Sequence, residues 1–368
     1  MASDIKFEAP VAPRLILWLI DTRSLWPVTP EASPHDEVMK LPKVAFRAFK
    51  LLSQTERESV LKYHHLKDAK MSLASHLLKH LVITKYLGVP WSRSQISRSV
   101  HGKPCYLHDP AQAHIDFNVS HQAGLVSLIA LIGYDKSVQV GTDIVCTDER
   151  RRTDYEFIDR EGFSAWVDIY EDVFADSELK HLRSSLRNLE DVGVHLKGAE
   201  LTEPGRIALS ECQRRNEKVS LGIVTAEGIS REIQVKSDII IECKLRRFYA
   251  LWCVREAFIK MTGEAFFAPW LKDLEFVQVE APKPRPDVTS IENGDSIKDF
   301  EIFRRSSPSK VPHMVKNVKM SLVALGKNFM IAGAICTPNG VPESDFAKEN
   351  WRFLELESDI LSVAETSQ

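Results

Sequence analysis

The sequence lacks the features that mark several large classes of protein. Its six cysteines are scattered singly with no Cys-x-x-Cys pair, so neither a structural zinc site nor a disulfide framework is indicated, and reduced thiols are expected. The net charge of -3 and the isoelectric point near 6.5 show no basic excess of the kind that coats nucleic acid. No apolar run approaches the roughly 18 residues that span a bilayer. We therefore expect a cytoplasmic protein that binds neither nucleic acid nor membrane.

Several common catalytic signatures are also absent. There is no GxxxxGK[ST], no GxGxxG after a strand, no HExxH and no GxSxG, which argues against the usual nucleotide-binding loops, zinc proteases and serine hydrolases. His76 and His80 could ligate a metal from one helical face, but the neighbouring sequence offers no acidic or third imidazole partner, so an ordinary amphipathic helix is the alternative. Ser120 and His121 are adjacent on a predicted strand and point to opposite faces, which argues against a direct Ser-His nucleophile pair.

The composition is that of a globular protein, with 44% hydrophobic and 27% charged residues over 368 positions. The apolar run at 14–23 is ended by charge too soon for a signal peptide and predicts a first strand. The strands predicted at 124–133 and 137–145 are expected to lie around a tight turn. The order of strand, helices and strands occurs twice, which predicts two α+β halves. The other elements predicted from periodicity are helices within 51–88 and 154–190, a strand at 114–121, a helix from Leu245 to Met261 ended by Gly263, and a hairpin at 319–336.

Asp143 interrupts an otherwise apolar predicted strand, "VQVGTDIV". A carboxylate on a half-buried strand is costly unless a cation, a cluster of donors or a metal satisfies it. Gly141, two residues earlier, leaves room for a ligand or another backbone to approach. The alternative is an aspartate that caps the next turn. His121 shares its strand face with Phe117 and is, in the same way, either a ligand contact or a hydrogen-bonded residue beside the core.

Glu256 and Lys260 lie four residues apart in "LWCVREAFIKMTGEA", so a helix places them on one face. An exposed Glu-Lys pair stabilises a helix by only about 0.3–0.5 kcal/mol and is common, so a surface salt bridge is one interpretation. Trp252 and Phe248 lie one and two turns before Glu256 on the same face, and such a stripe is typical of a buried surface. The second interpretation is a pair that faces a ligand, with Arg255 adding positive charge suited to phosphate oxygens.

Four short stretches occur in a specific order over roughly residues 50–280. They are "GKP" (102–104), "FNVSH" (117–121), "VGTD" (140–143) and "WCVREAFIKMTGEA" (252–265). Together they resemble the Sfp-type 4'-phosphopantetheinyl transferases, most closely those of filamentous fungi. The resemblance implies transfer of the phosphopantetheine arm from coenzyme A to a serine of a carrier protein, with release of 3',5'-ADP.

The fold implied by this resemblance is α+β, with two pseudo-symmetric halves and with coenzyme A and Mg²⁺ in the cleft between them. We expect an N-terminal half at 14–138 that contacts the nucleotide and a C-terminal half at 139–340 that carries the metal and catalytic residues. The polar region at about 186–240 is interpreted as an insertion, and residues 341–368 as a tail or surface helix. A chain of two halves needs no second copy to build its cleft, so a monomer is expected.

The resemblance also implies roles for single residues. The catalytic residues would be Asp143, Glu256 and Lys260. Asp143 and Glu256 would ligate Mg²⁺, and Glu256, or a water that it holds, would accept the proton of the attacking serine. Lys260 would stabilise the pyrophosphate leaving group. The residues that match positions holding the nucleotide and its phosphates are Lys103, Pro104, Ser120 and His121, with Arg98 and Lys67 near the 3'-phosphate.

Two positions depart from the family pattern. Many bacterial members carry a second acid two residues after the motif aspartate, where this chain has Val145, so water or Gln122 would complete the ligands of the metal. Many members have Lys where this chain has Arg255, which keeps the charge with a different geometry.

The leading hypothesis is a Mg²⁺-dependent transferase that activates carrier proteins or carrier domains of fatty-acid, polyketide and non-ribosomal peptide synthases, with the aminoadipate reductase of lysine biosynthesis as a further substrate. The alternative is a catalytically inactive homologue that binds coenzyme A or carrier domains as a scaffold. A third hypothesis is a structural protein whose motifs arise by chance, for which Glu256→Gln would change no activity.

Overall fold

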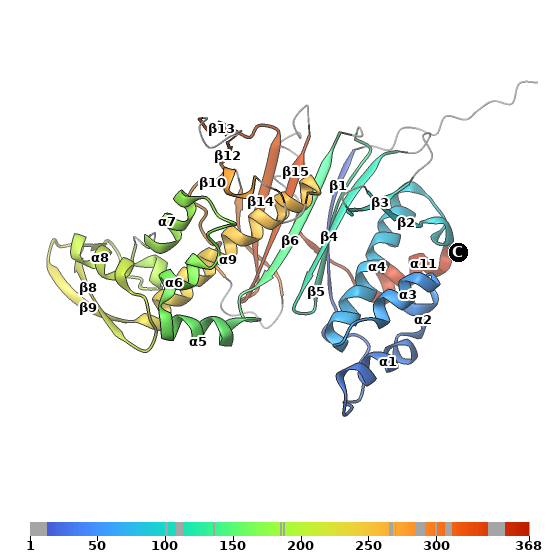
Figure 1. Cartoon of the computed structure of the whole chain (residues 1–368), viewed down its shortest axis with the longest axis horizontal. Coiled ribbons are helices and arrows are strands. Elements are labelled where there is room, and N and C mark those ends of the chain that lie inside the picture. The colour runs from blue at the N-terminus through green and yellow to red at the C-terminus, as the bar shows by residue number, and fades with distance from the viewer. Residues whose placement is uncertain are drawn as a thin grey trace, which may run out of the picture.

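Two four-stranded sheets form the middle of the molecule, and each carries a long helix on its outer face (Figure 1). Apolar side chains of both sheets fill the space between them, and two further cores lie under the helices. The result is four layers in the order helix, sheet, sheet, helix, which confirms the predicted α+β class. The computed structural model describes residues 13–99, 102–107, 113–134, 137–184, 186, 188–264, 268, 270–284, 291–298, 300–305, 311–337 and 350–367, and statements on structure concern these residues.

The first sheet has the strand order β16-β1-β5-β4. Its outer face is covered by α4, whose buried side includes Leu73, Leu77 and Leu81. Beside β4 lies the small β2-β3 hairpin. The elements of this half are β1 (Arg14–Asp21), α1 (Pro34–Val44), α2 (Phe46–Lys50), α3 (Gln54–Leu61), α4 (Leu66–Leu87), η1 (Trp91–Arg93), β2 (Ile96–Arg98), β3 (Pro104–Tyr106), β4 (Ile115–Gln122) and β5 (Leu125–Ile132), joined by β16 (Arg352–Phe353).

The second sheet has the order β11-β14-β15-β6 and is covered by α9. The region interpreted as an insertion contains α8 and the sheet β7-β8-β9, which extend away from the second sheet (Figure 1). The elements are β6 (Gln139–Cys146), α5 (Arg151–Glu161), α6 (Phe163–Asp168), α7 (Asp176–Ser184), η2 (Glu190–Val192), β7 (Glu200–Leu201), α8 (Glu203–Glu211), β8 (Lys218–Val224), β9 (Ser230–Lys236), α9 (Ser237–Thr262), η3 (Leu271–Asp273), β10 (Leu274–Phe276), β11 (Asn293–Lys298), β12 (Ile302–Arg304), β13 (His313–Met314), β14 (Val318–Leu325) and β15 (Phe329–Cys336).

The long helix α9 begins at Ser237 rather than near Leu245. Ile240 and Ile241 are fully buried in the core beneath it, so packing overrides the low helix propensity of this β-branched run. The helix ends at Gly263 as predicted, where φ is 76°. Across the described ranges, no helix has the length and apolar character that a membrane span requires.

The predicted strands are present, but one predicted pairing is wrong. The hairpin at 319–336 is confirmed as β14 and β15. The strands β5 and β6, by contrast, do not pair with each other around a tight turn. β5 pairs with β1 and β4, whereas β6 pairs with β15. Because every residue of β5 is buried, this strand requires neighbours on both edges and cover on both faces. The first sheet provides the neighbours, and α4 and the second sheet cover the two faces. The chain crosses from the first sheet to the second between Ile132 and Gln139.

Side chains on one face of β4 join the two sheets where their edges meet. Alternate residues of β4 point toward β6 and accept hydrogen bonds from its backbone. The N–H of Val140 donates to Asp116 (2.7 Å), and the N–H of Thr142 donates to Asn118 (3.1 Å). These contacts replace a backbone ladder between the two edge strands and fix the register of β4 against β6.

Residues 350–367 return to the N-terminal half, which differs from the predicted tail or surface helix. Trp351 is buried between the sheets, and β16 pairs in parallel with β1. A π-helical turn, η4 (Leu356–Leu361), and α11 (Ser362–Thr366) then pack against α4, where Ile360 is fully buried. The segment therefore completes both the edge of the first sheet and the core beneath α4. Residues 341–349 of the predicted tail lie outside the described ranges.

Candidate active site

Asp143, Ser120 and Lys260 meet where the edges of the two sheets and α9 come together. Asp143 lies on β6 and is 6% exposed, Ser120 lies on β4, and Lys260 lies in the last turn of α9. The Oδ1 atom of Asp143 accepts a hydrogen bond from Ser120 Oγ (2.8 Å) and pairs with Lys260 Nζ (2.5 Å). Lys260 Nζ is also 2.9 Å from Ser120 Oγ. The three side chains thus form one polar cluster built by both sheets and α9.

Gly141 explains how α9 comes so close to β6. A Cβ atom at this position would lie 2.1 Å from the backbone oxygen of Ala257 and 2.3 Å from the backbone nitrogen of Met261. Of the two alternatives that the sequence left open, a ligand or another backbone, the structure shows the second. Because side chains alternate along a strand, Asp143 points to the same face as Gly141 and so toward α9.

Glu256 lines a cavity of about 300 Å³ together with Ser120, His121, Asp143 and Lys260. It is 8% exposed and accepts no hydrogen bond from any residue in the described ranges. Burial raises the pKa of its carboxyl to about 8, the charge of Asp143 adds to the rise, and Lys260 opposes it. The structure therefore favours a Glu256–Lys260 pair that faces a ligand over an exposed salt bridge.

Lys260 remains a cation in this cavity. Burial lowers the pKa of its ammonium, but the carboxylates of Asp143 and Glu256 outweigh this effect and raise that pKa above its ordinary value. About a third of the side chain, 31%, stays exposed. The ammonium can therefore contact an anionic group that enters the cavity.

The donor set fits a divalent cation that takes few protein ligands. Asp143 and Glu256 supply carboxylate oxygens, and nowhere in the described ranges do three or more His, Cys, Asp and Glu side chains form a group that could hold a metal. Mg²⁺ is commonly bound by one or two carboxylates, with water and substrate phosphate completing its shell. The unpartnered carboxyl of Glu256 beside Asp143 therefore suits Mg²⁺ and does not suit a closed zinc site.

Gln122 and Val145 also line the cavity, at the positions where a further metal ligand was considered. The Oε1 atom of Gln122 accepts a hydrogen bond from the backbone N–H of Cys146 (2.9 Å). This oxygen has a second lone pair, so its bond to Cys146 leaves both expected ligands, water and Gln122, open.

Arg255 does not face the cavity, so the expected contribution of its charge to phosphate binding is wrong. Its side chain is 1% exposed and pairs with Glu178 of α7 (2.5 Å). It also donates to the backbone oxygens of Leu271 and Leu274 (both 2.8 Å). One residue along a helix rotates the side chain by about 100°, so Arg255 points into the core when Glu256 points into the cavity.

The remaining predicted site residues lie outside this cavity, in the N-terminal half. Lys103 pairs with Asp116 (2.6 Å), beside Pro104 at the start of β3. Arg98 of β2 donates to the backbone oxygen of Gly102 (2.8 Å). Lys67, at the start of α4, pairs with Glu149 (3.1 Å) and lines a separate cavity of about 490 Å³. The structure therefore brings together Ser120, His121, Asp143, Glu256 and Lys260, and it leaves Lys67, Arg98, Lys103 and Pro104 outside their cavity.

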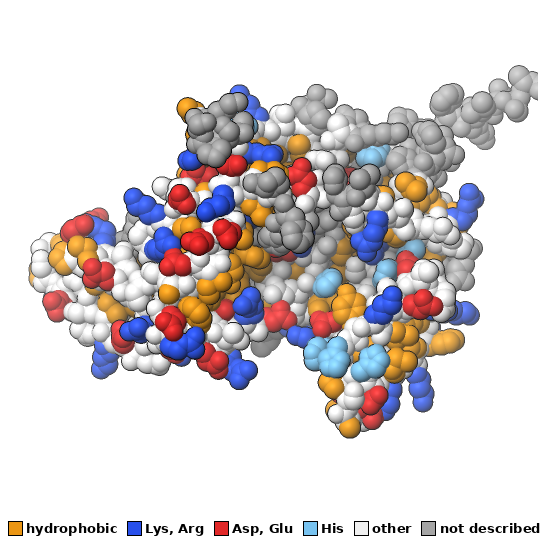
Figure 2. Space-filling view, viewed as in Figure 1, with side chains coloured by type: hydrophobic (Ala, Val, Ile, Leu, Met, Phe, Trp, Pro, Cys, Tyr) orange, Lys and Arg blue, Asp and Glu red, His pale blue; other side chains and the backbone are white. Residues whose placement is uncertain are grey.

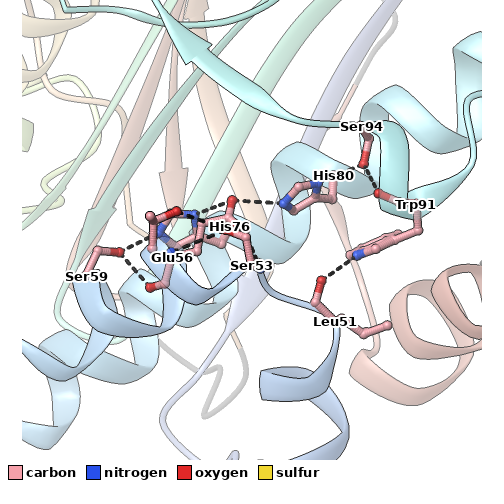
Figure 3. A network of polar contacts seen from close by, with 9 residues as sticks. Leu51, Ser53, Glu56, Ser59, His76, His80, Trp91 and Ser94 are labelled. Carbon is pink, nitrogen blue, oxygen red and sulfur yellow. Dashed lines mark hydrogen bonds and ion pairs between the residues drawn. The ribbon is translucent and has the colours of Figure 1, made fainter.

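The metal site considered for His76 and His80 is instead a hydrogen-bonded cluster (Figure 3). The Oε1 atom of Glu56, on α3, lies 3.2 Å from His76 Nδ1 and 2.9 Å from His80 Nε2. The other ring nitrogens contact Ser59 (3.0 Å) and Ser94 (2.7 Å). All four ring nitrogens are thus occupied within the protein. The sequence gives no signal that links Glu56 to His76, because the two residues are 20 positions apart and meet only when α3 packs on α4.

The cavity also has walls that sequence reasoning did not assign to a site. Phe248 and Trp252 had a signal, the aromatic stripe that leads to Glu256. Arg150 and Tyr170 had none, because they come from other parts of the chain and no spacing links them to α9. The cavity walls so added are Arg150, Tyr170, Phe248, Tyr249 and Trp252.

Glu256→Gln should stabilise the ligand-free protein at alkaline pH. The folded-state pKa of about 8 lies above the ordinary 4.5, so the folded protein keeps a proton that the unfolded chain releases. The stability associated with that proton is present below about pH 4.5 and is lost as the pH rises to 8 and beyond. Compared with wild type, the free energy of unfolding of the variant should therefore be little changed at pH 5 and higher by on the order of 1–3 kcal/mol at pH 9. Urea unfolding without divalent cations measures this difference.

Glu242→Gln is the matched control for this measurement. Glu242 lies on the same helix but is 37% exposed and pairs with Arg151 at the surface, so its loss should give no gain that grows with pH. If the free energies of unfolding of wild type and Glu256→Gln differ by the same amount at pH 5 and at pH 9, then Glu256 titrates normally in the folded protein.

Several known proteins are similar to this chain, two of them over almost its whole length. A family profile described as "4'-phosphopantetheinyl transferase, N-terminal" matches residues 42–132. A 4'-phosphopantetheinyl transferase of Aureobasidium melanogenum is 41% identical over 95% of this chain and 97% of the relative. The 4'-phosphopantetheinyl transferase NpgA of Emericella nidulans is 30% identical over 97% and 96%. An L-aminoadipate-semialdehyde dehydrogenase-phosphopantetheinyl transferase of Schizosaccharomyces pombe is 31% identical over 47% of this chain and 60% of the relative.

Proposed function

This chain belongs to the 4'-phosphopantetheinyl transferase family, and from this premise we propose that it transfers the 4'-phosphopantetheine arm of coenzyme A to a serine hydroxyl of carrier proteins. The serine oxygen forms a bond to the phosphorus that bears the arm, the bond from that phosphorus to the bridging oxygen breaks, and 3',5'-ADP leaves. The observation that supports this most is the single cavity shared by Asp143, Glu256 and Lys260. Transfer of a phosphoryl group depends on such positioned charges.

Asp143 and Glu256 would hold Mg²⁺, which when bound supplies positive charge against the pyrophosphate oxygens. Glu256 accepts the proton of the attacking serine, directly or through a water that it holds. Its carboxyl accepts no hydrogen bond from a described residue, whereas that of Asp143 already does, so Glu256 is the carboxyl open to a proton from the serine or from such a water. Lys260, which carries its charge into the cavity, contacts the phosphate of the leaving group.

We assign the nucleotide end of coenzyme A to the β4 side of the cavity. Ser120 and His121 form part of the cavity wall there. The β2-β3 hairpin lies next to β4 and carries Arg98 on β2 and Pro104 on β3, with Lys103 immediately before Pro104. Lys67 is exposed on the same half, at the start of α4. These cations suit the phosphates of the nucleotide, including the 3'-phosphate.

The inactive-scaffold alternative finds no support in this arrangement. A protein that only binds coenzyme A has no need for an unpartnered carboxyl at the point of transfer, and Glu256 has no hydrogen-bond donor among the described residues. Loss of such a costly group would stabilise a scaffold, so its presence favours the enzyme.

The carriers that we propose as substrates are those of fatty-acid, polyketide and non-ribosomal peptide synthases and of aminoadipate reductase in lysine biosynthesis. The last is supported by the similarity to the aminoadipate-semialdehyde dehydrogenase-modifying relative of Schizosaccharomyces pombe. We also propose a cytoplasmic monomer, because all six cysteines are free thiols and one chain supplies every wall of the cavity described above.

An apo carrier domain incubated with the protein, coenzyme A and Mg²⁺ should gain the mass of one phosphopantetheine arm. The gain should disappear with a chelator and return when Mg²⁺ is restored, because two carboxylates alone leave the pyrophosphate charge unbalanced. Intact-protein mass spectrometry of the carrier measures this. A carrier with its acceptor serine changed to alanine is the control, and tight coenzyme A binding without a mass gain on any carrier would favour the scaffold.

A further inference from the structure

The ion pair between Lys103 and Asp116 joins three segments that are far apart in the sequence. Lys103 lies directly before β3, Asp116 lies on β4, and both side chains bind the backbone of Val140 on β6. β4 lies between the β2-β3 hairpin and β6 (Figure 1). The pair is therefore placed between the hairpin to which we assigned the nucleotide and the strand that carries Asp143.

The two side chains take the place of a backbone neighbour for Val140. The Oδ2 atom of Asp116 accepts a hydrogen bond from the N–H of Val140 (2.7 Å) and pairs with Lys103 Nζ (2.6 Å). Lys103 Nζ in turn donates to the backbone oxygen of Val140 (2.9 Å). In a regular sheet, the backbone of a neighbouring strand supplies such a donor and such an acceptor. Both polar backbone groups of Val140 are thus bonded by side chains.

The same pair holds the end of the hairpin turn. The backbone oxygen of Lys103 accepts a hydrogen bond from the N–H of Ser99 (2.8 Å), and the N–H of Lys103 donates to Ser99 Oγ (3.2 Å). Arg98 donates to the backbone oxygen of Gly102 within this turn. Because the ammonium of Lys103 is anchored at Val140, the turn and Arg98 are held at a set distance from β6.

This pair differs from the ion pairs of the molecular surface. Figure 2 shows Lys and Arg side chains mixed with Asp and Glu over the visible face, and exposed pairs contribute little to stability. The side chains of Lys103 and Asp116 are only 12% and 17% exposed. Charged hydrogen bonds that are shielded from water are stronger and more fixed in geometry. We call Lys103, Asp116 and Val140 the clamp.

The clamp determines where Asp143 lies. Asp143 follows Val140 by three residues on β6, which is about 10 Å at the rise of a β-strand. A shift of β6 against β4 by one residue would turn the carboxylate of Asp143 to the opposite face, away from Lys260. Asn118 holds β6 at the next position along β4. Of the two β4 side chains, Asp116 is the one that carries a charge and reaches the hairpin as well.

We infer that Asp116 is a positioning residue for the transfer reaction, and that it fixes, through Lys103 and Val140, the distance between the two ends of the coenzyme A site. The inference rests on the proposed function and adds a residue that acts through its neighbours. Coenzyme A is one molecule that must be held at its nucleotide and at its pyrophosphate together. A fixed distance therefore favours the whole cosubstrate over a fragment that occupies one end.

The test compares coenzyme A with 3',5'-ADP, a fragment that lacks the arm and occupies the nucleotide end. Asp116→Ala should lower kcat/KM for coenzyme A about tenfold or more in carrier assays with Mg²⁺, because a small misplacement of reacting groups is costly. The same variant should change the Kd of 3',5'-ADP in calorimetric titrations by less than about twofold. Asp116→Asn keeps an acceptor for the N–H of Val140 and should show a smaller loss of kcat/KM. Glu31→Gln, which removes an exposed ion pair with Lys40 in the same half, is the control and should change neither value.

Each other outcome overturns the inference in a distinguishable way. A lower Tm with unchanged kcat/KM in Asp116→Ala would show that Asp116 contributes to stability alone. An equal loss of affinity for coenzyme A and 3',5'-ADP would assign the effect to nucleotide binding by Lys103. A wild-type protein that binds neither ligand and modifies no carrier would overturn the proposed function together with the inference.

Discussion

Replacing Asp143 with asparagine should lower the rate of phosphopantetheine transfer by about three orders of magnitude or more. Asparagine keeps the size of the side chain but removes the charge that pairs with Lys260 at 2.5 Å and that would hold Mg²⁺ with Glu256. Both losses act where negative charge develops on the pyrophosphate. The effect should therefore fall mainly on kcat, with a smaller change in the KM for the carrier.

Single-turnover measurements with a carrier domain would separate this effect from slow product release. Glu242→Gln neutralises a carboxylate on the surface of α9 and should keep near wild-type rates. Because Asp143 is 6% exposed, a thermal melt must show that the variant is folded. A folded Asp143→Asn protein with a rate within tenfold of wild type would contradict the role assigned to this carboxylate.

Glu178→Ala should destabilise the protein by about 3–5 kcal/mol. The carboxylate of Glu178 and the guanidinium of Arg255 lie 2.5 Å apart, and each side chain is only 1% exposed. Removing the acid leaves the guanidinium buried between the rings of Phe174 (5.2 Å) and Phe276 (5.7 Å) without a counter-charge. Since Arg255 precedes Glu256 in the chain, the variant should also lose activity through the position of α9.

Urea unfolding at pH 7 measures the effect, and Glu203→Ala provides the control. Glu203 pairs with Arg206 at the surface, with side chains 71% and 45% exposed, so its loss should cost less than about 1 kcal/mol. The double variant Glu178→Leu, Arg255→Met should recover only part of the stability. It leaves no charge in the core, but it also leaves the buried backbone groups that bond to this ion pair without their partners. A cost below about 1 kcal/mol for Glu178→Ala would mean that water reaches Arg255 in the folded protein.

The sequence was enough to predict most elements but not which strands are neighbours. Alternation and apolar runs locate β4, β5 and β6, and the short connection after β5 predicts a hairpin with β6. That pairing is wrong because β5 is covered on both faces and already has β1 and β4 at its edges. A similar limit applies to β16, since a two-residue strand that pairs with β1 carries no periodic signal of its own.

The candidate site was predictable where its residues break a local pattern. A carboxylate in an apolar strand marked Asp143, and a charged continuation of an aromatic stripe marked Glu256 and Lys260. Arg255 looked equally functional by charge, but only the three-dimensional structure shows its partner, Glu178, on α7. Arg150 and Tyr170 break no pattern in their own segments, so their place in the cavity depends on tertiary packing alone.

The return of residues 350–367 to the first sheet sets an order on events during synthesis. β1, β5 and α4 are made early, yet their edge strand and part of their core arrive only with this last segment. A ribosome adding about 5–20 residues per second needs roughly 10–45 s to make the roughly 220 residues in between. For that time the nascent N-terminal half keeps a strand edge and an apolar face open. Chaperones on the ribosome should therefore bind this open edge and apolar face. The binding surface is covered only after residues 350–367 have been made and have packed against it.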